Sequence, residues 1–282
     1  MKKTFQYQNT SISYHVEGNG RPVVLLHGFG EDSNIFNHQI AFLKEHCLLI
    51  VPDLPGSGKS ELLKQSLHQH STSNIQLPIS SVQYSASMND YAKIVQALLQ
   101  HENITTCTLL GHSMGGYITL AFAELYPSML NGFGLVHSTA FADNEEKKQN
   151  RQRGIEMMEQ YGPYPFLKNT TPNLFGKKFK EAYPEKVETL IEAGKTFTKE
   201  ALQQYYAAMM SRLDKTPVLK GSKTPVLFIM GTEDVAAPLN DILQQSVLPE
   251  CSYIHVLEGV GHMSMWEAAD QLNHYLLLFI NR

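Results

Sequence analysis

The sequence predicts an α/β fold built around a doubly wound, mostly parallel β-sheet. Short, continuous apolar runs are typical of parallel strands that are covered on both faces. They recur at residues 23–26, 48–51, 107–110, 133–136 and 226–230. A helical pattern separates the second run from the third, because apolar side chains repeat at i, i+3 and i+4 over residues 88–99. Strands that alternate with helices indicate βαβ units and a parallel sheet.

Two stretches in the first third of the chain depart from this rhythm. Residues 5–7 and 12–16 alternate apolar and polar side chains, which predicts a pair of antiparallel, partly exposed strands. Residues 65–81 are rich in Gln, Ser and His and show no periodicity, which predicts a mobile surface loop.

Composition narrows the class of protein. The 282 residues carry a formal net charge of −4, which gives no electrostatic footprint for nucleic acid. Residues 1–3 are not followed by the apolar segment of a signal peptide, and the apolar run at 275–280 is too short to span a bilayer. Cys47, Cys107 and Cys251 are odd in number and widely spaced, and the first two are expected in strands. We therefore expect a cytoplasmic protein without disulfides or membrane insertion.

The most specific motif follows the strand predicted at 107–110. Residues 111–116 read Gly-His-Ser-Met-Gly-Gly, and the residues after them have helical spacing. A strand, then Gly-x-Ser-x-Gly, then a helix is the setting of a nucleophile elbow, a sharp turn that lifts the Ser113 hydroxyl above the sheet edge. Gly111 and Gly115 are expected because a Cβ at either position would collide with the neighbouring strand and helix.

Three further motifs stand at the ends of predicted strands. The strand at 226–230 leads to Asp234, and a later strand leads to the pair Gly261-His262. Serine, acid and histidine in this chain order are typical of one class of catalytic triad. Upstream, residues 27–30 read His-Gly-Phe-Gly, where the glycines let a backbone N–H face the serine and supply half of an oxyanion hole.

Together these motifs resemble those of the α/β-hydrolase superfamily, in its serine-nucleophile branch, and the resemblance covers nearly all of the chain. It implies that Ser113 attacks a carbonyl carbon, that His262 takes and returns the proton, and that Asp234 orients the imidazole. The backbone N–H groups of Phe29 and Met114 would bind the oxyanion. Such a reaction needs neither an organic cofactor nor a metal.

The resemblance also assigns the long segment between the fourth and fifth apolar runs. Residues 139–213 are too many for one crossover helix and carry helical patterns at 151–161 and 199–212. In hydrolases of this kind that position holds a helical cap over the active site. We therefore expect an α/β-hydrolase core formed by 1–138 and 214–282, with an inserted helical cap at 139–213. An apolar cap implies an apolar substrate channel.

Neighbouring carboxylates and histidines compete for the same roles. Glu233 adjoins Asp234 but is expected to be a solvated turn residue, and Asp241 a surface carboxylate of the following helix. His262 is favoured among the histidines because it follows a strand and precedes a helix predicted at 265–279.

Other residues near the motifs are expected to be structural. The sequence predicts that His27 hydrogen-bonds around the oxyanion turn and that His112 packs or hydrogen-bonds beneath the elbow. His255 lies inside a predicted strand, and His274 and Trp266 lie in the last predicted helix, where Trp266 is expected in the core.

Two patterns mimic nucleotide-binding loops, and each lacks a required residue. Residues 53–60 read Asp-Leu-Pro-Gly-Ser-Gly-Lys-Ser, but Asp53 stands where a phosphate-binding loop needs glycine. Gly28, Gly30 and Ser33 follow a strand as in a dinucleotide fingerprint, but the third glycine is missing. We expect neither kind of cofactor.

The sequence thus predicts a serine hydrolase that cleaves a small-to-medium, largely apolar carboxylic ester through an acyl-enzyme on Ser113. C–C bond hydrolases, thioesterases, proline iminopeptidases and perhydrolases share the motifs and stay open as alternatives. A C–C hydrolase would need a basic cap residue for a carboxylate, and Arg151, Arg153 and Arg212 are the candidates. A ligand receptor without turnover is the alternative from another class. The expected partner is a small-molecule substrate, and the oligomeric state stays open.

Overall fold

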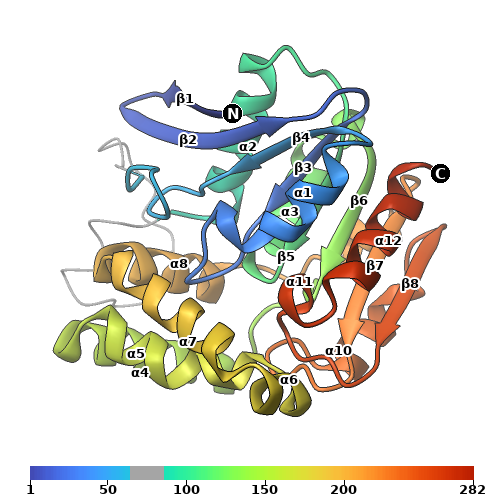
Figure 1. The fold of residues 1–282 in the computed structure, drawn as a ribbon. Coiled ribbons are helices and arrows are strands. Elements are labelled where there is room, and N and C mark those ends of the chain that lie inside the picture. Colours follow the sequence, from blue (N-terminus) through green and yellow to red (C-terminus); the bar gives the residue numbers. More distant parts are fainter. Residues whose placement is uncertain (64–85) are drawn as a thin grey trace.

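A sheet of eight strands forms the centre of the protein, which the computed structural model describes over residues 1–63 and 86–282 (Figure 1). The strand order is β1-β2-β4-β3-β5-β6-β7-β8. β2 pairs antiparallel with β1 and with β4, and all later neighbours are parallel. The strands are β1 Lys2–Tyr7, β2 Thr10–Glu17, β3 Pro22–Leu26, β4 Leu48–Pro52, β5 Cys107–His112, β6 Leu130–Val136, β7 Val226–Gly231 and β8 Ser252–Leu257. This confirms the predicted sheet and its antiparallel opening pair, while the loop predicted at 65–81 lies outside the described residues.

Helices cover both faces of the sheet, and a further group stands at one end of it (Figure 1). The α-helices around the sheet are α1 Asn37–Leu43, α2 Met88–His101, α3 Met114–Leu125, α9 Thr216–Lys220, α10 Leu239–Ser246, α11 Ser264–Glu267 and α12 Ala269–Ile280. The group at the end, here called the inserted helices, comprises α4 Glu145–Tyr161, α5 Pro163–Thr170, α6 Lys177–Ala182, α7 Pro184–Ala193 and α8 Lys199–Ser211. Short 3₁₀ turns are η1 Ser33–Phe36, η3 Pro127–Met129, η4 Thr171–Leu174 and η5 Gly194–Thr196.

Two apolar cores lie on opposite faces of the sheet. Successive side chains of a strand point to opposite faces, so Val23 and Leu25 of β3 join the core under α1 and α12. Val24 and Leu26 join the core under α2 and α3. This double burial explains why the central strands are mostly apolar, and it fixes the strand ends that carry the polar motifs.

Local signals set several helix ends. α2 begins at a capping box in which the Ser87 side chain accepts from the Asp90 N–H and the Asp90 carboxylate accepts from the Ser87 N–H. α4 begins before the predicted residue 151, because Asn144 caps it and accepts a hydrogen bond from the Lys147 N–H.

Three sequence expectations need correction. The helix predicted at 265–279 is broken at Ala268, whose φ of −141° and ψ of 46° separate α11 from α12. Trp266 is half-buried rather than in the core, and it packs against Phe175. Cys47 is buried, but it lies just before β4 instead of within a strand.

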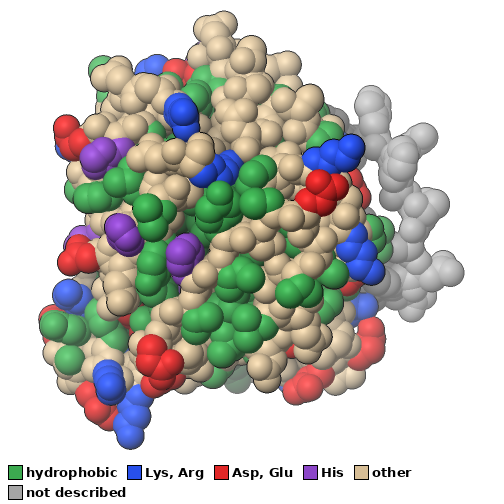
Figure 2. All heavy atoms as spheres, turned by 90° about the vertical axis from the view of Figure 1, so that its right-hand side faces the viewer, with side chains coloured by type: hydrophobic (Ala, Val, Ile, Leu, Met, Phe, Trp, Pro, Cys, Tyr) green, Lys and Arg blue, Asp and Glu red, His purple; other side chains and the backbone are tan. Residues whose placement is uncertain are grey.

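β8 forms the edge of the sheet, and its outer residues face solvent. Ile254 and Val256 expose 42% and 44% of their surface, and hydrophobic and histidine side chains gather on this face (Figure 2). His255 stacks on Tyr275 with ring centroids 3.9 Å apart, which agrees with the structural role predicted for it. Within residues 1–63 and 86–282, none of the helices has the length and apolar character that crossing a bilayer requires.

Candidate active site

Ser113 stands between β5 and α3 in a strained turn. Its φ of 51° and ψ of −115° are uncommon for any residue with a side chain, and such strain persists only where the surroundings enforce it. Here the Ser113 N–H donates to the Val136 carbonyl at 3.0 Å. The Ser138 hydroxyl donates to the Ser113 carbonyl at 2.7 Å. The sharp turn predicted at 111–116 is therefore present, and the end of β6 holds it in place.

The glycines of this turn are required by close packing. A Cβ on Gly111 would overlap the Gly115 carbonyl, and a Cβ on Gly115 would overlap the Leu26 carbonyl of β3. The first turn of α3 therefore packs directly against β5 and β3, which leaves Ser113 at the carboxyl end of β5, at the edge of the sheet.

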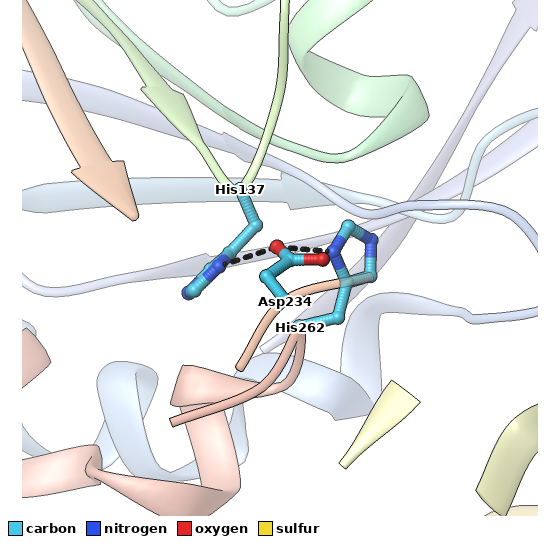
Figure 3. Close-up of side chains that lie close together, drawn as sticks. All are labelled: His137, Asp234 and His262. Atoms are coloured by element: carbon cyan, nitrogen blue, oxygen red, sulfur yellow. Dashed lines mark hydrogen bonds and ion pairs between the residues drawn. The ribbon is translucent and has the colours of Figure 1, made fainter. Parts of the chain in front are cut away.

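Asp234 and His262 meet in a buried, hydrogen-bonded pair (Figure 3). Asp234 follows β7, and its Oδ1 accepts from the N–H groups of Ala236 and Ala237, both at 2.9 Å. Its Oδ2 accepts from His262 Nδ1 at 2.8 Å and from His137 Nδ1 at 3.0 Å. The carboxylate therefore receives four hydrogen bonds, which fix both of its oxygens.

These contacts set the charge states of the pair. Burial opposes ionisation of Asp234, but the charge of His262 and the hydrogen bonds from His137 and His262 hold its pKa far below its ordinary range. Burial also disfavours protonation of His262, yet the charge and hydrogen bond of Asp234 raise its pKa above the ordinary 6.5. An ionised Asp234 fixes the proton of His262 on Nδ1 and leaves Nε2 to act as a base.

The backbone of His262 is tied by hydrogen bonds to His112, next to the Ser113 turn, and to the inserted helices. His112, the residue before Ser113, has its ring Nε2 at 2.9 Å from the His262 carbonyl, and the two rings lie 4.8 Å apart by centroid. The His262 N–H donates to the Leu174 carbonyl of η4 at 2.6 Å. His262 is thereby joined to the residue before Ser113, although no hydrogen bond joins the Ser113 hydroxyl to another described residue.

A half-buried carboxylate, Glu267, accepts hydrogen bonds from both residues that flank His262. Its Oε1 accepts from the Met263 N–H at 3.0 Å. Its Oε2 accepts from the N–H groups of Gly261 at 3.0 Å and Gly176 at 2.8 Å. Burial raises the pKa of Glu267 in spite of these bonds. Glu267 thus fixes both neighbours of His262. Its side chain points back toward Gly261 and Met263 just before the break between α11 and α12.

A buried carboxylate, Glu31, shapes the turn at residues 27–31. Glu31 Oε2 accepts from the Gly28 N–H at 2.7 Å and lies 3.0 Å from His112 Nδ1. Burial opposes its charge, but His112 and the Gly28 N–H lower the pKa of Glu31 below its ordinary value. No described residue accepts a hydrogen bond from the N–H of Phe29 or of Met114, the two donors that the sequence assigns to an oxyanion.

His27 bonds to the loop after β4 as well as to its own turn at residues 27–31. Its Nε2 accepts from the Leu54 N–H at 2.9 Å and lies 2.8 Å from the Ser57 hydroxyl, while Nδ1 lies 2.8 Å from the Gly28 carbonyl. His27 therefore joins the turn at 27–31 to the loop after β4.

The inserted helices cover this turn. The Phe29 ring stacks on Tyr206 of α8, with centroids 4.2 Å apart, and meets Phe166 of α5 edge-on at 6.2 Å. Beside them lies a cavity of about 90 Å³, bounded by residues 29–31 and by Leu167, Thr170, Leu190 and Tyr206 among others. A larger hollow of about 470 Å³ lies between α3 and α9 and is lined by none of the predicted site residues.

Asp143 binds two of the three candidate arginines. Its carboxylate lies 2.6 Å from Arg151 Nε and 2.9 Å from Arg212 Nη1, and its side chain is fully buried. The Arg212 guanidinium also sits 3.8 Å above the Tyr117 ring of α3, and that of Arg151 lies 5.2 Å from the Tyr206 ring. This network joins the first and last inserted helices to the helix that follows Ser113.

His137, Asp234 and His262 also form a group whose possible metal-ligand atoms lie within 4.8 Å of one another. Both imidazoles direct Nδ1 at the same ionised carboxylate oxygen, so each Nδ1 carries a proton and has no lone pair there for a metal. The arrangement therefore fits a hydrogen-bonded set rather than a metal centre.

The competing residues lie as the sequence predicts, but three contributors were missed. Glu233 is exposed and accepts from the Lys177 N–H at 2.7 Å, while Asp241 lies in α10. Missed were His137, Glu31 and Glu267. The position of His137 directly after an apolar strand was the available signal, because the carboxyl ends of parallel strands converge.

The chain is similar to hydrolases and to one acyltransferase component. A dihydrolipoyllysine-residue acetyltransferase component of the acetoin cleaving system from Pseudomonas putida is 28% identical over 93% of this chain, which spans 64% of that protein. A 2-hydroxy-6-oxononadienedioate/2-hydroxy-6-oxononatrienedioate hydrolase from Paraburkholderia phymatum is 25% identical over 96% of this chain and 91% of its own length.

The fold and the family follow from two further comparisons. The solved structure of a thermophilic esterase from Thermogutta terrifontis matches with a TM-score of 0.88 and 24% identity, over 100% of this chain and 98% of that one. A family model described as the alpha/beta hydrolase family matches residues 23–274. That match, on the sheet described above, shows that the chain belongs to the alpha/beta hydrolase family.

Proposed function

We propose that the protein is a serine hydrolase that cleaves a small-to-medium, largely apolar carboxylic ester through an acyl-enzyme on Ser113. One observation carries this proposal: a buried Asp234–His262 pair, 2.8 Å apart, is joined through His112 to the turn that holds Ser113 at positive φ between a strand and a helix. Nucleophile, base and orienting acid are the parts that acyl transfer needs.

In the proposed reaction, His262 Nε2 takes the Ser113 proton as the Oγ attacks the carbonyl carbon of the ester. The imidazolium that forms is stabilised by Asp234 and then protonates the leaving alcohol. Water attacks the acyl-enzyme with His262 again as the base, which releases the acid and restores Ser113.

The N–H groups of Phe29 and Met114 are the proposed oxyanion donors. Met114 is the first residue of α3, where helical N–H groups lack intrahelical partners and the helix dipole favours negative charge. Each donor of this kind contributes about 2.7–4 kcal/mol to lowering the barrier. Glu31 supports them by holding the Gly28 N–H and so fixing the turn that presents Phe29.

We further propose that residues 139–213 act as a cap over a core formed by 1–138 and 214–282. The support comes from contacts that join the inserted helices to the site: Tyr206 on Phe29 and the Leu174 carbonyl on the His262 N–H. A cap that touches both the oxyanion turn and the base would shape the substrate pocket directly.

Arginine contacts favour an ester over a C–C substrate. Arg151 and Arg212 are both engaged by Asp143, and Arg212 also donates to the carbonyls of Phe141 and Met209. Arg153 is bonded to Asn150 on the surface. Within the described residues, no arginine of this segment is left to hold the carboxylate of a ring-cleavage product.

The acid limb of the pH profile is expected to lie above pH 6.5. His262 must be neutral to act as a base, and the Asp234 charge raises its pKa above 6.5. Activity therefore rises with pH through that raised pKa and is lost as the pH falls below it. Measuring kcat/KM for one ester across pH 5 to 9 checks this expectation, and a profile that stays flat down to pH 5 would exclude His262 as the base.

An ester series is expected to size the acyl pocket. The cavity of about 90 Å³ beside Phe29 is lined by neither Ser113 nor His262, so it does not set the preferred chain length. We expect hydrolysis of p-nitrophenyl esters from acetate to dodecanoate to depend on Ser113, and kcat/KM to peak at one chain length because a closed pocket fits one length best. Rates that are unchanged in Ser113→Ala, or no turnover of any ester, would contradict the proposed reaction.

A further inference from the structure

His137 is a buried imidazole for which the proposed reaction has no direct use. It follows β6, has no exposed surface, and directs Nδ1 at Asp234 Oδ2 from 3.0 Å, on the other side of that oxygen from His262 (Figure 3). Its φ is 51°, in the left-handed region that residues with a side chain seldom adopt. The His137 N–H donates to the Ile229 carbonyl of β7 at 2.8 Å, which helps to hold this conformation.

The surroundings of His137 determine which of its ring nitrogens carries the proton. Burial lowers the pKa of His137 to about 4, so the ring is neutral at ordinary pH and carries a single N–H. Because Asp234 is ionised and accepts hydrogen bonds only, that N–H is on Nδ1. His137 Nε2 is then a bare lone pair, buried and with no partner among the described residues. A side chain that only filled the core would not need the polar Nε2 atom, so the ring is explained by the hydrogen bond that Nδ1 makes to Asp234.

The neighbours of His137 belong to the nucleophile. Val136 accepts from the Ser113 N–H at 3.0 Å, and Ser138 donates to the Ser113 carbonyl at 2.7 Å. Three successive residues therefore fix the backbone of the nucleophile and one oxygen of the acid. The end of β6 sets the distance between Ser113 and Asp234.

We propose that His137 is a positioning residue that holds Asp234 in register with Ser113 and limits the basicity of His262 by sharing the same carboxylate oxygen. The proposal rests on the function proposed above. Each hydrogen bond to Oδ2 draws charge from that oxygen, so a donor on one side weakens the stabilisation that Asp234 gives to the His262 imidazolium on the other. Restricting the basicity of His262 keeps more of it neutral, and thus competent as a base, near neutral pH.

Other charged and titratable groups lie near His137, Asp234 and His262, and the substitutions at residue 137 leave them unchanged. His112 from β5 lies with its ring 4.8 Å from that of His262 and 6.1 Å from that of His137. Glu31, from the turn after β3, and Glu267, from α11, both act on His262 through their charge. Because they are untouched by substitutions at residue 137, a change in the titration of His262 reports the contact between His137 and Asp234.

The test compares His137→Ala with His137→Asn. Alanine removes the donor, whereas the Asn side-chain N–H can occupy the place of imidazole Nδ1, and Asn tolerates positive φ well. The readout is the rate of inactivation by a fluorophosphonate as a function of pH, which depends on Ser113 and its base but on no particular substrate. We expect the midpoint of the acid limb to move upward by about 0.5 pH or more in His137→Ala. In His137→Asn the midpoint of the acid limb should stay within about 0.2 pH of the wild-type midpoint.

Either of two results would overturn the inference. A lower plateau rate in His137→Ala with an unmoved midpoint would mean that the residue is structural only. An equal shift in both variants would mean that the hydrogen bond to Asp234 is not the cause.

A second readout separates this inference from the proposed function. If the wild type is not labelled at Ser113, the proposed hydrolase fails, and the ¹⁵N resonances of the histidine rings still report whether His262 titrates higher in His137→Ala. If that variant does not fold, the wild-type spectrum alone decides. A His137 ring protonated on Nδ1 at neutral pH supports the inference, and one protonated on Nε2 contradicts it.

Discussion

Replacing Ser113 by alanine is expected to lower kcat for ester hydrolysis by about 10⁴- to 10⁶-fold, since the change removes the atom that forms the proposed acyl-enzyme. KM should change little, because the proposed oxyanion donors are backbone groups. The alanine methyl occupies space that the serine already fills, so only the adjustment to the positive φ of residue 113 affects folding. The measurement is steady-state hydrolysis of p-nitrophenyl butyrate, with circular dichroism to verify the fold.

Ser128 provides the matched control for this substitution. It is exposed and lies in η3, after the far end of α3 from Ser113. Ser128→Ala should keep the wild-type rate within about twofold, as is usual for surface changes. A folded Ser113→Ala protein that keeps more than about a tenth of the wild-type kcat would rule out an acyl-enzyme at this residue.

Replacing Asp234 by asparagine is expected to lower kcat by about 10⁴-fold, the effect of the same change in a well-characterised Ser-His-Asp triad, if Asp234 orients His262 as proposed. The N–H groups of Ala236 and Ala237 donate to Oδ1, so the Asn carbonyl must take that place. The amide nitrogen then faces the Nδ1 atoms of His137 and His262. His262 must move its proton to Nε2 to accept that contact, and it can no longer take the proton of Ser113.

Glu233→Gln is the control for Asp234→Asn. Glu233 is the adjacent carboxylate, and it is exposed and accepts only from the Lys177 N–H among the described residues. Glutamine keeps an acceptor there, so kcat should stay within about twofold of the wild type. If kcat falls as much in Glu233→Gln as in Asp234→Asn, Asp234 is not the only carboxylate that orients His262, and the proposed assignment is contradicted.

Much of the fold could be predicted from the sequence because the governing interactions are local or periodic. β5 and β7 are buried at every position since helices cover both of their faces, and the mostly apolar runs at residues 107–110 and 226–230 are the mark of that burial. The glycines around Ser113 were predictable for the same reason, because a strand that passes directly into a helix leaves no room for a Cβ. Asp234 and His262 stand next to such strand ends, where polar residues converge.

The missed contributors depend on contacts between distant parts of the chain. His137 meets Asp234 across 97 residues, Glu31 meets His112 across 81, and Glu267 reaches Gly176 across 91. A buried Glu or His is uncommon without a partner, and the partner is defined only once the sheet has formed. The break at Ala268 has the same origin, since helical periodicity continues through it while the Glu267 carboxylate bonds back to Gly261 and Met263.

The mass of the protein after reaction with a fluorophosphonate, followed by peptide mapping, tests the proposed acyl-enzyme site most directly. Phosphonylation requires a serine that is activated by a neighbouring base, and it needs no knowledge of the natural substrate. We expect one equivalent of label on the peptide that contains Ser113, none in Ser113→Ala, and a strongly reduced rate in Asp234→Asn. Folded wild-type protein that stays unlabelled, or that carries the label on another residue, would contradict a serine hydrolase built on Ser113.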